Sequence, residues 1–322
     1  MSAVTEVWEV GGEFHLPVDP PGPYHRWPEG AVWYALGRHA VEALLGQLRS
    51  PRLWLPDYFC HEVAARWRET AVVELYEDDP RWPEPRWESL RTAPRDVVVA
   101  VNYFGVRRGA PWREWREETS YVLVEDHAHD PASDWATTST ADYAFSSLRK
   151  TLPVPDGAIL WSPRGLPLPD QPAGGADGSE LKLAAMLLKG EYLERGDDGL
   201  KDRFRRLQLD GEERLAEAAV SGASAATRES LVRGVPLPWR ARRSENTARL
   251  LSSLHGWASP SRCSRSGPRM RRRSAPFSCS GRSRSATRFG KRCARAASTA
   301  RCTGRTRPNR ARRACASSRR GS

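Results

Sequence analysis

The chain has 322 residues and a formal net charge of +12, with 51 Lys and Arg against 39 Asp and Glu. This length is sufficient for one large domain or two, each with a buried core. The opening MSAVTEVWEVGGEF has no basic segment followed by an apolar one, and no apolar run approaches the length of a membrane span. We therefore expect neither a secretory signal nor a membrane protein, and expect a cytoplasmic one.

The positive charge is confined to one end of the chain. Residues 258–322 contain 20 Lys and Arg and no Asp or Glu, so residues 1–257 hold the other 31 basic residues and all 39 acidic ones, a net charge of −8. All 13 Trp lie in residues 1–257, whereas five of the six Cys lie in residues 258–322. The chemistry is therefore expected in an acidic body.

Three explanations of residues 258–322 are open. They could form a disordered arginine-rich arm that binds nucleic acid. They could form a disulfide or metal module, although the Cys spacings fit no ligand pattern and no His accompanies them. They could also be translated out of frame, because Arg, Ala, Gly, Ser, Pro and Cys are the residues that GC-rich DNA encodes in a wrong frame. We favour the frameshift and do not expect nucleic acid as a partner.

The body alternates between apolar strands and helices. After a Pro- and Gly-rich extended lead-in over residues 1–30, a helix is expected at 35–48, with Ala40, Val41, Leu44 and Leu45 at helical spacing. Strands are expected at 53–56, 72–76, 96–105, 121–126, 142–147 and 157–162, separated by helices at 60–69, 87–91 and 112–118. A loop is expected at 166–179, followed by helices at 179–194, 201–219 and 244–254.

This alternation predicts an α/β fold with three layers, in which a mostly parallel sheet is covered by helices on both faces. We expect a large domain at 31–165 and, at 166–257, a helical connector with the start of a small domain. The C-terminal small domain would be incomplete or missing, because it falls in the tail.

The carboxyl ends of three strands carry the candidate chemistry, and ligands of parallel sheets gather at such ends. Asp126 ends one strand, Lys150 lies just beyond another, and Asn102 ends a third. A lysine can form a Schiff base with the aldehyde of pyridoxal phosphate (PLP), while a carboxylate keeps the pyridine nitrogen protonated. These positions therefore suggest a PLP site.

The motifs GRHAVEALL, LPDYFC, EDHAH and FSSLRKTLPVPDGA follow one another across residues 37–158. In order and spacing they resemble the DegT/DnrJ/EryC1/StrS sugar aminotransferases, a group of the fold-type I PLP-dependent transferases. The resemblance covers somewhat over a third of the chain. It implies the large domain of that fold, PLP as cofactor, a small-molecule amino donor (often glutamate), a keto-sugar nucleotide or similar carbonyl acceptor, and a homodimer.

The resemblance also implies roles for individual residues. Lys150 matches the Schiff-base lysine and Asp126 the partner of the pyridine nitrogen, and we take both as catalytic. His129 stands where the family usually has Gln, near the phenolic oxygen. Ser146 matches the phosphate-contacting serine but lies one residue closer to the lysine than usual, so Ser147 is a possible substitute.

Other cofactor-binding candidates are less specific. The start of the first helix offers backbone N–H groups to a phosphate, and Tyr58 or Phe59 could stack on the cofactor ring. Arg38 departs from the small or hydroxyl residue common there, and Gly157-Ala158 stands where the family often has Gly-Gly. The full set of cofactor-binding candidates is Lys150, Asp126, His129, Ser146, Ser147, Gly37, Arg38, His39, Tyr58, Phe59 and Asn102.

Several alternatives remain at this point. The chain could be a catalytically impaired relative that lacks its C-terminal domain, or a protein whose basic tail binds nucleic acid. A dehydratase of the same fold is disfavoured by Lys150, since some relatives of that kind have His there. The HAHD stretch at 127–130 could bind a metal, but a third clear ligand is lacking, so no metal is expected. Trp112 and Trp115 are interpreted as packing residues, and Cys60 as an inert buried thiol.

Overall fold

The computed structural model describes residues 9, 12–16, 22–50, 52–116 and 121–255. The predictions made for residues 258–322 lie outside this part of the chain. All the elements below belong to one unit, Met1–Ser259.

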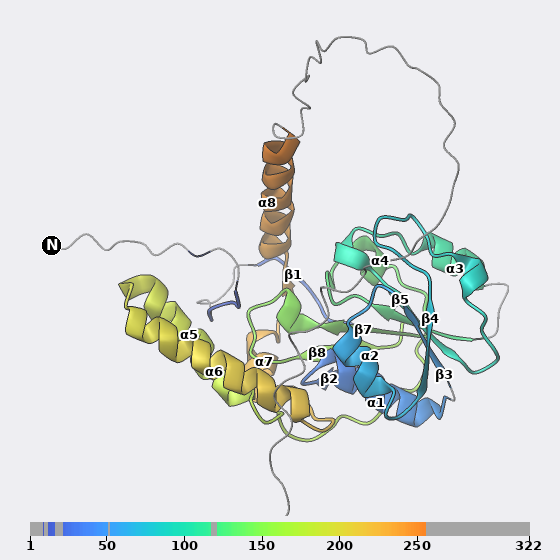
Figure 1. The fold of residues 1–322 in the computed structure, drawn as a ribbon, viewed down its shortest axis with the longest axis horizontal. Coiled ribbons are helices and arrows are strands. Elements are labelled where there is room, and N and C mark those ends of the chain that lie inside the picture. Colours follow the sequence, from blue (N-terminus) through green and yellow to red (C-terminus); the bar gives the residue numbers. More distant parts are fainter. Residues whose placement is uncertain (1–8, 10–11, 17–21, 51, 117–120, 256–322) are drawn as a thin grey trace, which may run out of the picture. The chain divides into compact units, whose positions relative to one another are not determined.

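A seven-stranded sheet forms the centre of this unit (Figure 1). Its strand order is β2-β8-β7-β6-β5-β3-β4. The five strands from β7 to β4 run parallel, whereas β8 pairs antiparallel with both β7 and β2. The strands are β2 (Val32–Tyr34), β3 (Arg52–Pro56), β4 (Val72–Tyr76), β5 (Val97–Val101), β6 (Val122–Asp126), β7 (Tyr143–Ser147) and β8 (Ala158–Trp161). The predicted α/β fold with a mostly parallel sheet is thus confirmed.

Helices cover both faces of this sheet. Successive side chains of a strand point to opposite faces, and in β5 Val97 packs in the cluster that contains α1 (Gly37–Leu48), whereas Val98 packs in the cluster that contains Trp112 of α3 (Ala110–Arg116). The second helix on the α1 face is α2 (His61–Trp67), and the second on the α3 face is α4 (Asp134–Thr137). The sheet is therefore the middle of three layers.

The chain beyond the sheet is mainly helical. Helices α5 (Ser179–Arg195) and α6 (Asp198–Glu217) lie side by side, as Figure 1 shows. They are followed by α7 (Ala225–Ser230), β9 (Val235–Pro236) and α8 (Leu237–His255), and β9 pairs with β1 (Tyr24–His25). Three short 3-10 helices complete the set: η1 (Trp87–Ser89), η2 (Tyr103–Gly105) and η3 (Leu148–Lys150).

Several elements differ from the sequence prediction. The strand expected at 96–105 ends at Val101 and gives way to η2, and α8 begins at Leu237 rather than at 244. The short elements β1, β2, β9, α4 and α7 were not predicted. Segments of two to six residues are too short for a hydrophobic period to appear, and β1 and β9 exist only because they pair with each other across about 210 residues of chain.

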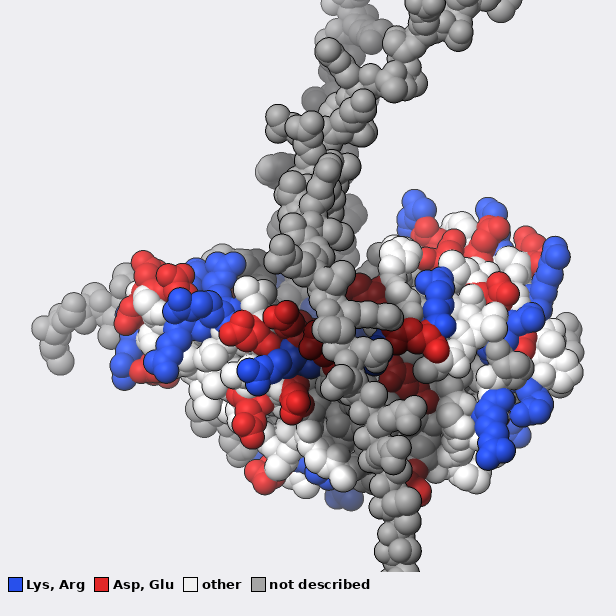
Figure 2. All heavy atoms as spheres, turned by 60° about the horizontal axis from the view of Figure 1, so that its bottom comes forward, with Lys and Arg blue, Asp and Glu red and all other residues white. Residues whose placement is uncertain are grey.

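Within the described part of the chain, no helix combines the length and apolar character needed to cross a membrane. On the face drawn in Figure 2, the Lys and Arg side chains of the described residues lie among Asp and Glu side chains.

Candidate functional site

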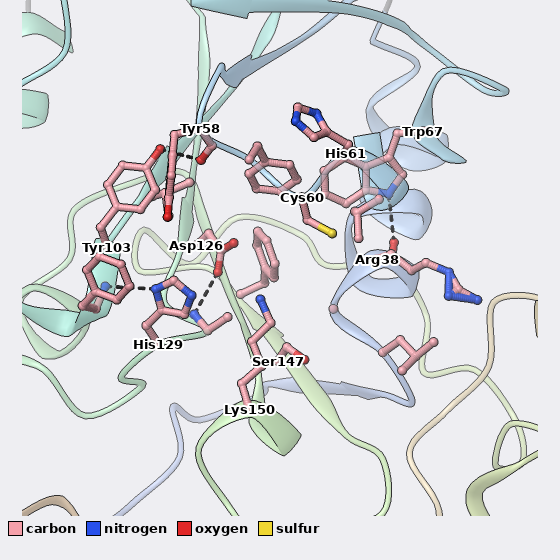
Figure 3. Close-up of a pocket in the computed structure, with 18 of the residues that line it drawn as sticks. Arg38, Tyr58, Cys60, His61, Trp67, Tyr103, Asp126, His129, Ser147 and Lys150 are labelled. Atoms are coloured by element: carbon pink, nitrogen blue, oxygen red, sulfur yellow. Dashed lines mark hydrogen bonds between the residues drawn. The ribbon is translucent and has the colours of Figure 1, made fainter. Parts of the chain in front are cut away.

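A cavity of about 520 Å³ opens at the carboxyl ends of the parallel strands. Its lining comes from the start of α1 and from the segments that follow β3, β5, β6 and β7. Figure 3 shows the side chains that converge on it. The cavity brings together eight of the predicted cofactor-binding residues: Gly37, Arg38, Tyr58, Phe59, Asp126, His129, Ser147 and Lys150.

Lys150 and Asp126 reach this cavity from neighbouring strands. Asp126 is the last residue of β6, and Lys150 ends η3, which directly follows β7. Since β6 and β7 are parallel neighbours, their carboxyl ends lie at the same edge of the sheet. The Asp126 carboxylate is nearly buried, and its Oδ1 accepts a hydrogen bond from the N–H of Ala128 at 2.8 Å. Both side chains point into the cavity (Figure 3).

His129 is held in one tautomer by the segment after β5. Its Nδ1 accepts a hydrogen bond from the backbone N–H of Phe104 at 2.9 Å, so the proton of the neutral ring must be on Nε2. The Phe104 ring stacks on the imidazole, with centroids 5.4 Å apart and planes at 10°. Burial lowers the pKa of His129, as does the charge of Lys150, while Asp126 opposes the shift. His129 therefore offers a neutral N–H donor.

The backbone of Phe104, whose N–H makes this hydrogen bond to His129, has a strained conformation. Its φ is 57°, in the left-handed region that non-glycine residues rarely adopt. Gly105 follows with φ 73°, and a Cβ on it would lie 2.4 Å from the Cβ of Asp130. The turn at Phe104 and Gly105 therefore packs closely against the segment that contains His129 and Asp130. Backbone strain of this kind is concentrated at functional sites.

The N-terminus of α1 is open toward the cavity. The N-cap residue, Leu36, makes no side-chain capping hydrogen bond, and the first turn of this 12-residue helix contains no acidic residue. The first N–H groups of a helix have no partner within the helix and attract anions. Ser147 lies beside them, since a Cβ on Gly37 would be 3.2 Å from the Cβ of Ser147. Gly37, Ser147 and the helix end together form a cradle that suits a phosphate.

Three predicted residues lie outside the cavity lining. The hydroxyl of Ser146 donates to the carbonyl of His127 at 3.1 Å, on the opposite side of β7 from Ser147. Asn102 is buried, and its Nδ2 donates to the Oγ of Ser133 at 2.8 Å. His39 is buried within α1, where its Nε2 donates to the carbonyl of Ala218 at 3.1 Å. These three side chains therefore do not face the cavity, and their hydrogen bonds join neighbouring segments of the chain instead.

Arg38 lines the cavity but directs its guanidinium elsewhere. Its Nη2 donates to the carbonyls of Leu215, Ala216 and Ala218, at 2.7, 2.9 and 3.1 Å. These carbonyls lie at and just beyond the C-terminal end of α6, where a cation complements the helix dipole. Arg38 therefore joins α1 to α6, and its backbone rather than its charge faces the cavity.

Among the cavity residues that sequence reasoning did not name as site candidates are Tyr103, Phe104 and Arg149. The Tyr103 hydroxyl donates to the carbonyl of Tyr58 at 2.9 Å, and the guanidinium of Arg107 lies over the Tyr103 ring at 4.9 Å. Arg107 is itself held by a buried two-point ion pair with Asp78, at 2.7 and 2.9 Å. The position of Tyr103 after β5 was the available signal, since that strand end was already expected to face a ligand.

The burial of two residues in the structure tests the interpretations that the sequence gave for them. Cys60 was taken for a buried thiol, which is wrong: it is exposed and lines the cavity, because it precedes α2 instead of lying on the packed face of that helix. Trp112 was taken for a packing residue, and it is 1% exposed and packs against Tyr76 and Trp87.

The possible metal cluster at 127–130 is divided by the fold. His127 is fully buried and bonds to Glu125 at 3.0 Å, whereas His129 lines the cavity. Among the residues that the structure describes, no three His, Cys, Asp or Glu side chains are placed to hold one metal ion.

Comparison with known proteins gives similar folds but no sequence match. No protein-family model and no curated protein matches the chain. A protein described as a sugar aminotransferase from Streptococcus pneumoniae, in its PLP form, is 14% identical, with 47% of this chain and 54% of that chain covered and a TM-score of 0.37. A DegT DnrJ EryC1 StrS aminotransferase from Brucella abortus is 14% identical, with 42% of each chain covered and a TM-score of 0.33.

The aminotransferase TlmJ from Streptoalloteichus hindustanus is 20% identical, with 41% of this chain and 40% of that chain covered and a TM-score of 0.33. The chain thus spans about half the length, or less, of these solved structures. At such identities and TM-scores the likeness concerns the course of the chain, and the chemistry has to be argued from the side chains of the cavity.

Proposed function

We propose that the chain is a PLP-dependent aminotransferase that uses Lys150 to transfer an amino group to a keto-sugar nucleotide or a similar carbonyl compound. The observation that carries this proposal is the meeting of Lys150, Asp126 and the open N-terminus of α1 in one cavity. A lysine, a carboxylate and an anion cradle are the three groups that PLP requires for its aldehyde, its pyridine nitrogen and its phosphate.

The cavity residues fit these three parts of PLP. The first N–H groups of α1 and the hydroxyl of Ser147 would hold the phosphate. Asp126 would hold the pyridine nitrogen, because its Oδ1 accepts from Ala128 while its Oδ2 has no hydrogen-bond partner among the described residues. Tyr58 or Phe59 would stack on the ring. We assign the phosphate contact to Ser147 rather than Ser146.

PLP, when bound, supplies an electron sink for the carbon that loses its proton. The Lys150 amine would take that proton and return it one position away, acting as general base and then as general acid. The Asp126 carboxylate would keep the pyridine nitrogen protonated. The Nε2–H of His129 would donate a hydrogen bond to the phenolic oxygen, and it can do so at neutral pH because the ring is uncharged.

We further propose that the chain acts as a homodimer. Tyr58 and Phe104 line the cavity and are 55% and 58% exposed, respectively. Aromatic side chains are enriched at protein–protein interfaces, which supports a second copy of the chain covering this surface.

The first test is reductive labelling of Lys150. The full chain is incubated with PLP and reduced with borohydride, and its peptides are searched by mass spectrometry for the pyridoxyl group. We expect the label on the peptide that contains Lys150, and its loss in Lys150→Ala. Lys201→Ala is the matched control, because Lys201 lies outside the cavity, paired with Glu9 at 2.7 Å. An unlabelled Lys150 in folded protein would overturn the proposed function.

A further inference from the structure

A buried arginine joins the turn after β5 to the segment after β4. Arg107 follows η2, and its side chain is 6% exposed. Its Nη1 and Nη2 bind the two oxygens of Asp78 at 2.9 and 2.7 Å. Its Nη2 also donates to the carbonyls of Asp79 and Trp82, at 3.0 and 2.9 Å. These hydrogen bonds from one guanidinium hold the two segments together.

The same guanidinium contacts a residue that lines the cavity. It lies over the ring of Tyr103, 4.9 Å from the ring centroid. The Tyr103 ring makes an edge contact with the Tyr58 ring, with centroids 5.6 Å apart, and its hydroxyl donates to the carbonyl of Tyr58 at 2.9 Å. Figure 3 shows the two tyrosines next to each other and this hydrogen bond between them. Contacts therefore run from Arg107 through Tyr103 to both the ring and the backbone of Tyr58.

A second link reaches the same segment through Asp78. The N–H of Asp78 donates to Oδ1 of Asp57 at 3.0 Å, and Asp57 lines the cavity directly before Tyr58. More than half of the Tyr58 side chain is exposed, so packing in the core does little to fix it. The position of Tyr58 therefore depends on the contacts that Arg107 and Asp78 maintain.

The other aromatic candidate for the cofactor ring is held in a different way. The ring of Phe59 packs against Trp67 of α2, with centroids 5.6 Å apart and planes at 32°. Phe59 also packs against the apolar cluster that contains α1. The core thus places Phe59, whereas Tyr58 is placed by the network around Arg107.

The ion pair at the centre of this network is a poor source of folding stability. Asp78 is fully buried, and an ion taken out of water loses its hydration. Burial raises the pKa of Asp78 to about 6, although the pairing with Arg107 opposes the shift. The neighbouring carboxylates of Asp57 and Asp79 add to the rise. A role in fixing geometry accounts for such a pair better than a gain in stability does.

We propose that Arg107 is a positioning residue, which fixes the Tyr58 side chain at the wall of the cavity through Tyr103. Asp78 completes the arrangement by holding both the guanidinium and the backbone that precedes Tyr58. Arg107 itself does not line the cavity, so it acts on a bound ring only through these neighbours. The inference rests on the proposed function in one respect, that the ring which Tyr58 meets is that of PLP. A lysine could reproduce neither the two-point pairing nor the stacking of a planar guanidinium.

The test is a double-mutant cycle on PLP binding to the full chain. PLP is titrated into the native chain, Arg107→Lys, Tyr58→Ala and the double variant, and binding is followed by the quenching of tryptophan fluorescence. We expect each single change to weaken binding about tenfold and the double change to weaken it no further, because Arg107 acts through Tyr58. Arg164→Lys is the control, since Arg164 also pairs with a buried aspartate, Asp142, at 2.7 Å, and neither residue lines the cavity. It should leave PLP binding unchanged.

An arginine that serves only folding predicts a different result. The losses caused by Arg107→Lys and Tyr58→Ala would then multiply to about a hundredfold, or Arg107→Lys would leave PLP binding unchanged, and either outcome overturns the proposal. Tyr103→Phe removes only the hydroxyl that bonds to Tyr58. It should show the same lack of additivity with Tyr58→Ala, and it takes the place of Arg107→Lys if that variant does not fold.

A measurement without ligand separates this inference from the proposed function. Hydrogen exchange is compared among the folded variants in peptides that cover residues 57–60. We expect Arg107→Lys to speed exchange there several-fold and Arg164→Lys to leave it unchanged. Faster exchange without labelling of Lys150 would sink the aminotransferase function alone, whereas labelling with unchanged exchange would sink the positioning role alone.

Discussion

His39 is a histidine whose position forces it to stay neutral. It lies in the first turn of α1, is fully buried, and donates through Nε2 to the carbonyl of Ala218, while its Nδ1 has no partner among the described residues. Burial lowers its pKa to about 4, helped by the charge of the neighbouring Arg38 and opposed by the hydrogen bond to Ala218. A charged ring here would face both an apolar surrounding and a cation.

Because of this shift, stability should fall in acid. Above pH 6.5 the ring is neutral in both the folded and the unfolded chain, so it contributes no pH dependence. As the pH falls from about 6.5 to about 4, only the unfolded chain binds the proton, and the free energy of unfolding decreases by up to about 3 kcal/mol. Urea unfolding of the native chain and of His39→Gln, which keeps a donor for Ala218, should diverge by this amount. Parallel pH profiles would contradict the prediction.

At the scale of elements, one carboxylate joins the sheet to the helices that follow it. Asp156 lies in the turn between β7 and β8, directly after the segment that carries Lys150. It accepts hydrogen bonds from the Ser179 hydroxyl at the start of α5, at 2.7 Å, and from the N–H and hydroxyl of Ser224, at 3.0 and 2.8 Å. Ser224 caps α7, and Thr227 of the same helix also donates to Asp156. The turn, α5 and α7 are thus held at one point.

Substitution of Asp156 should therefore be costly. Asp156→Asn keeps the shape but leaves one oxygen where two accepted, so buried donors lose their partners. We expect the free energy of unfolding to fall by about 3 kcal/mol or more, since bonds to a buried charged group are worth about 1.5–3 kcal/mol each. Asp210→Asn, at an exposed position of α6, should change it by less than about 0.5 kcal/mol. Denaturant unfolding of both variants distinguishes the two positions, and equal losses would refute the role of Asp156.

At the scale of the whole molecule, the surplus of basic residues and the residues of the candidate site lie in different parts of the chain. The described residues that line the cavity with Lys150 and Asp126 lie between Leu36 and Lys150, whereas the surplus of basic residues lies in 258–322.

Removal of residues 258–322 should therefore abolish retention on DNA but leave the labelling of Lys150 unchanged. The full chain, at +12, should be retained on immobilised DNA at low salt and released as salt rises, whereas residues 1–257, at −8, should not be retained. Borohydride labelling of Lys150 should survive the truncation. Retention of the shortened chain would place nucleic-acid binding in the body, and loss of labelling in a folded truncation product would make the tail part of the site.

Sequence patterns anticipated much of the fold and the centre of the site. The apolar runs of β5, β6 and β7 predicted a buried parallel sheet, because strands covered on both faces need apolar side chains at every position. From that sheet it followed that Asp126 and Lys150 would lie at one edge, and they line the same cavity. The strand β2 could not be found, since its partner β8 lies far along the chain, and α4 has only four residues, too few to show a hydrophobic period.

By itself, the sequence determined the type and order of the main elements and the strand ends where chemistry could occur, because both depend on local periodicity. Only the tertiary structure showed that Ser147 lines the cavity and Ser146 does not, since adjacent strand residues face opposite sides. It also decided that Arg38 caps α6 and that Phe104 holds the Nδ1 of His129. Lys182 and Glu13 meet beside Lys150 across 169 residues of chain. Such contacts depend on how distant elements pack, which no local pattern encodes.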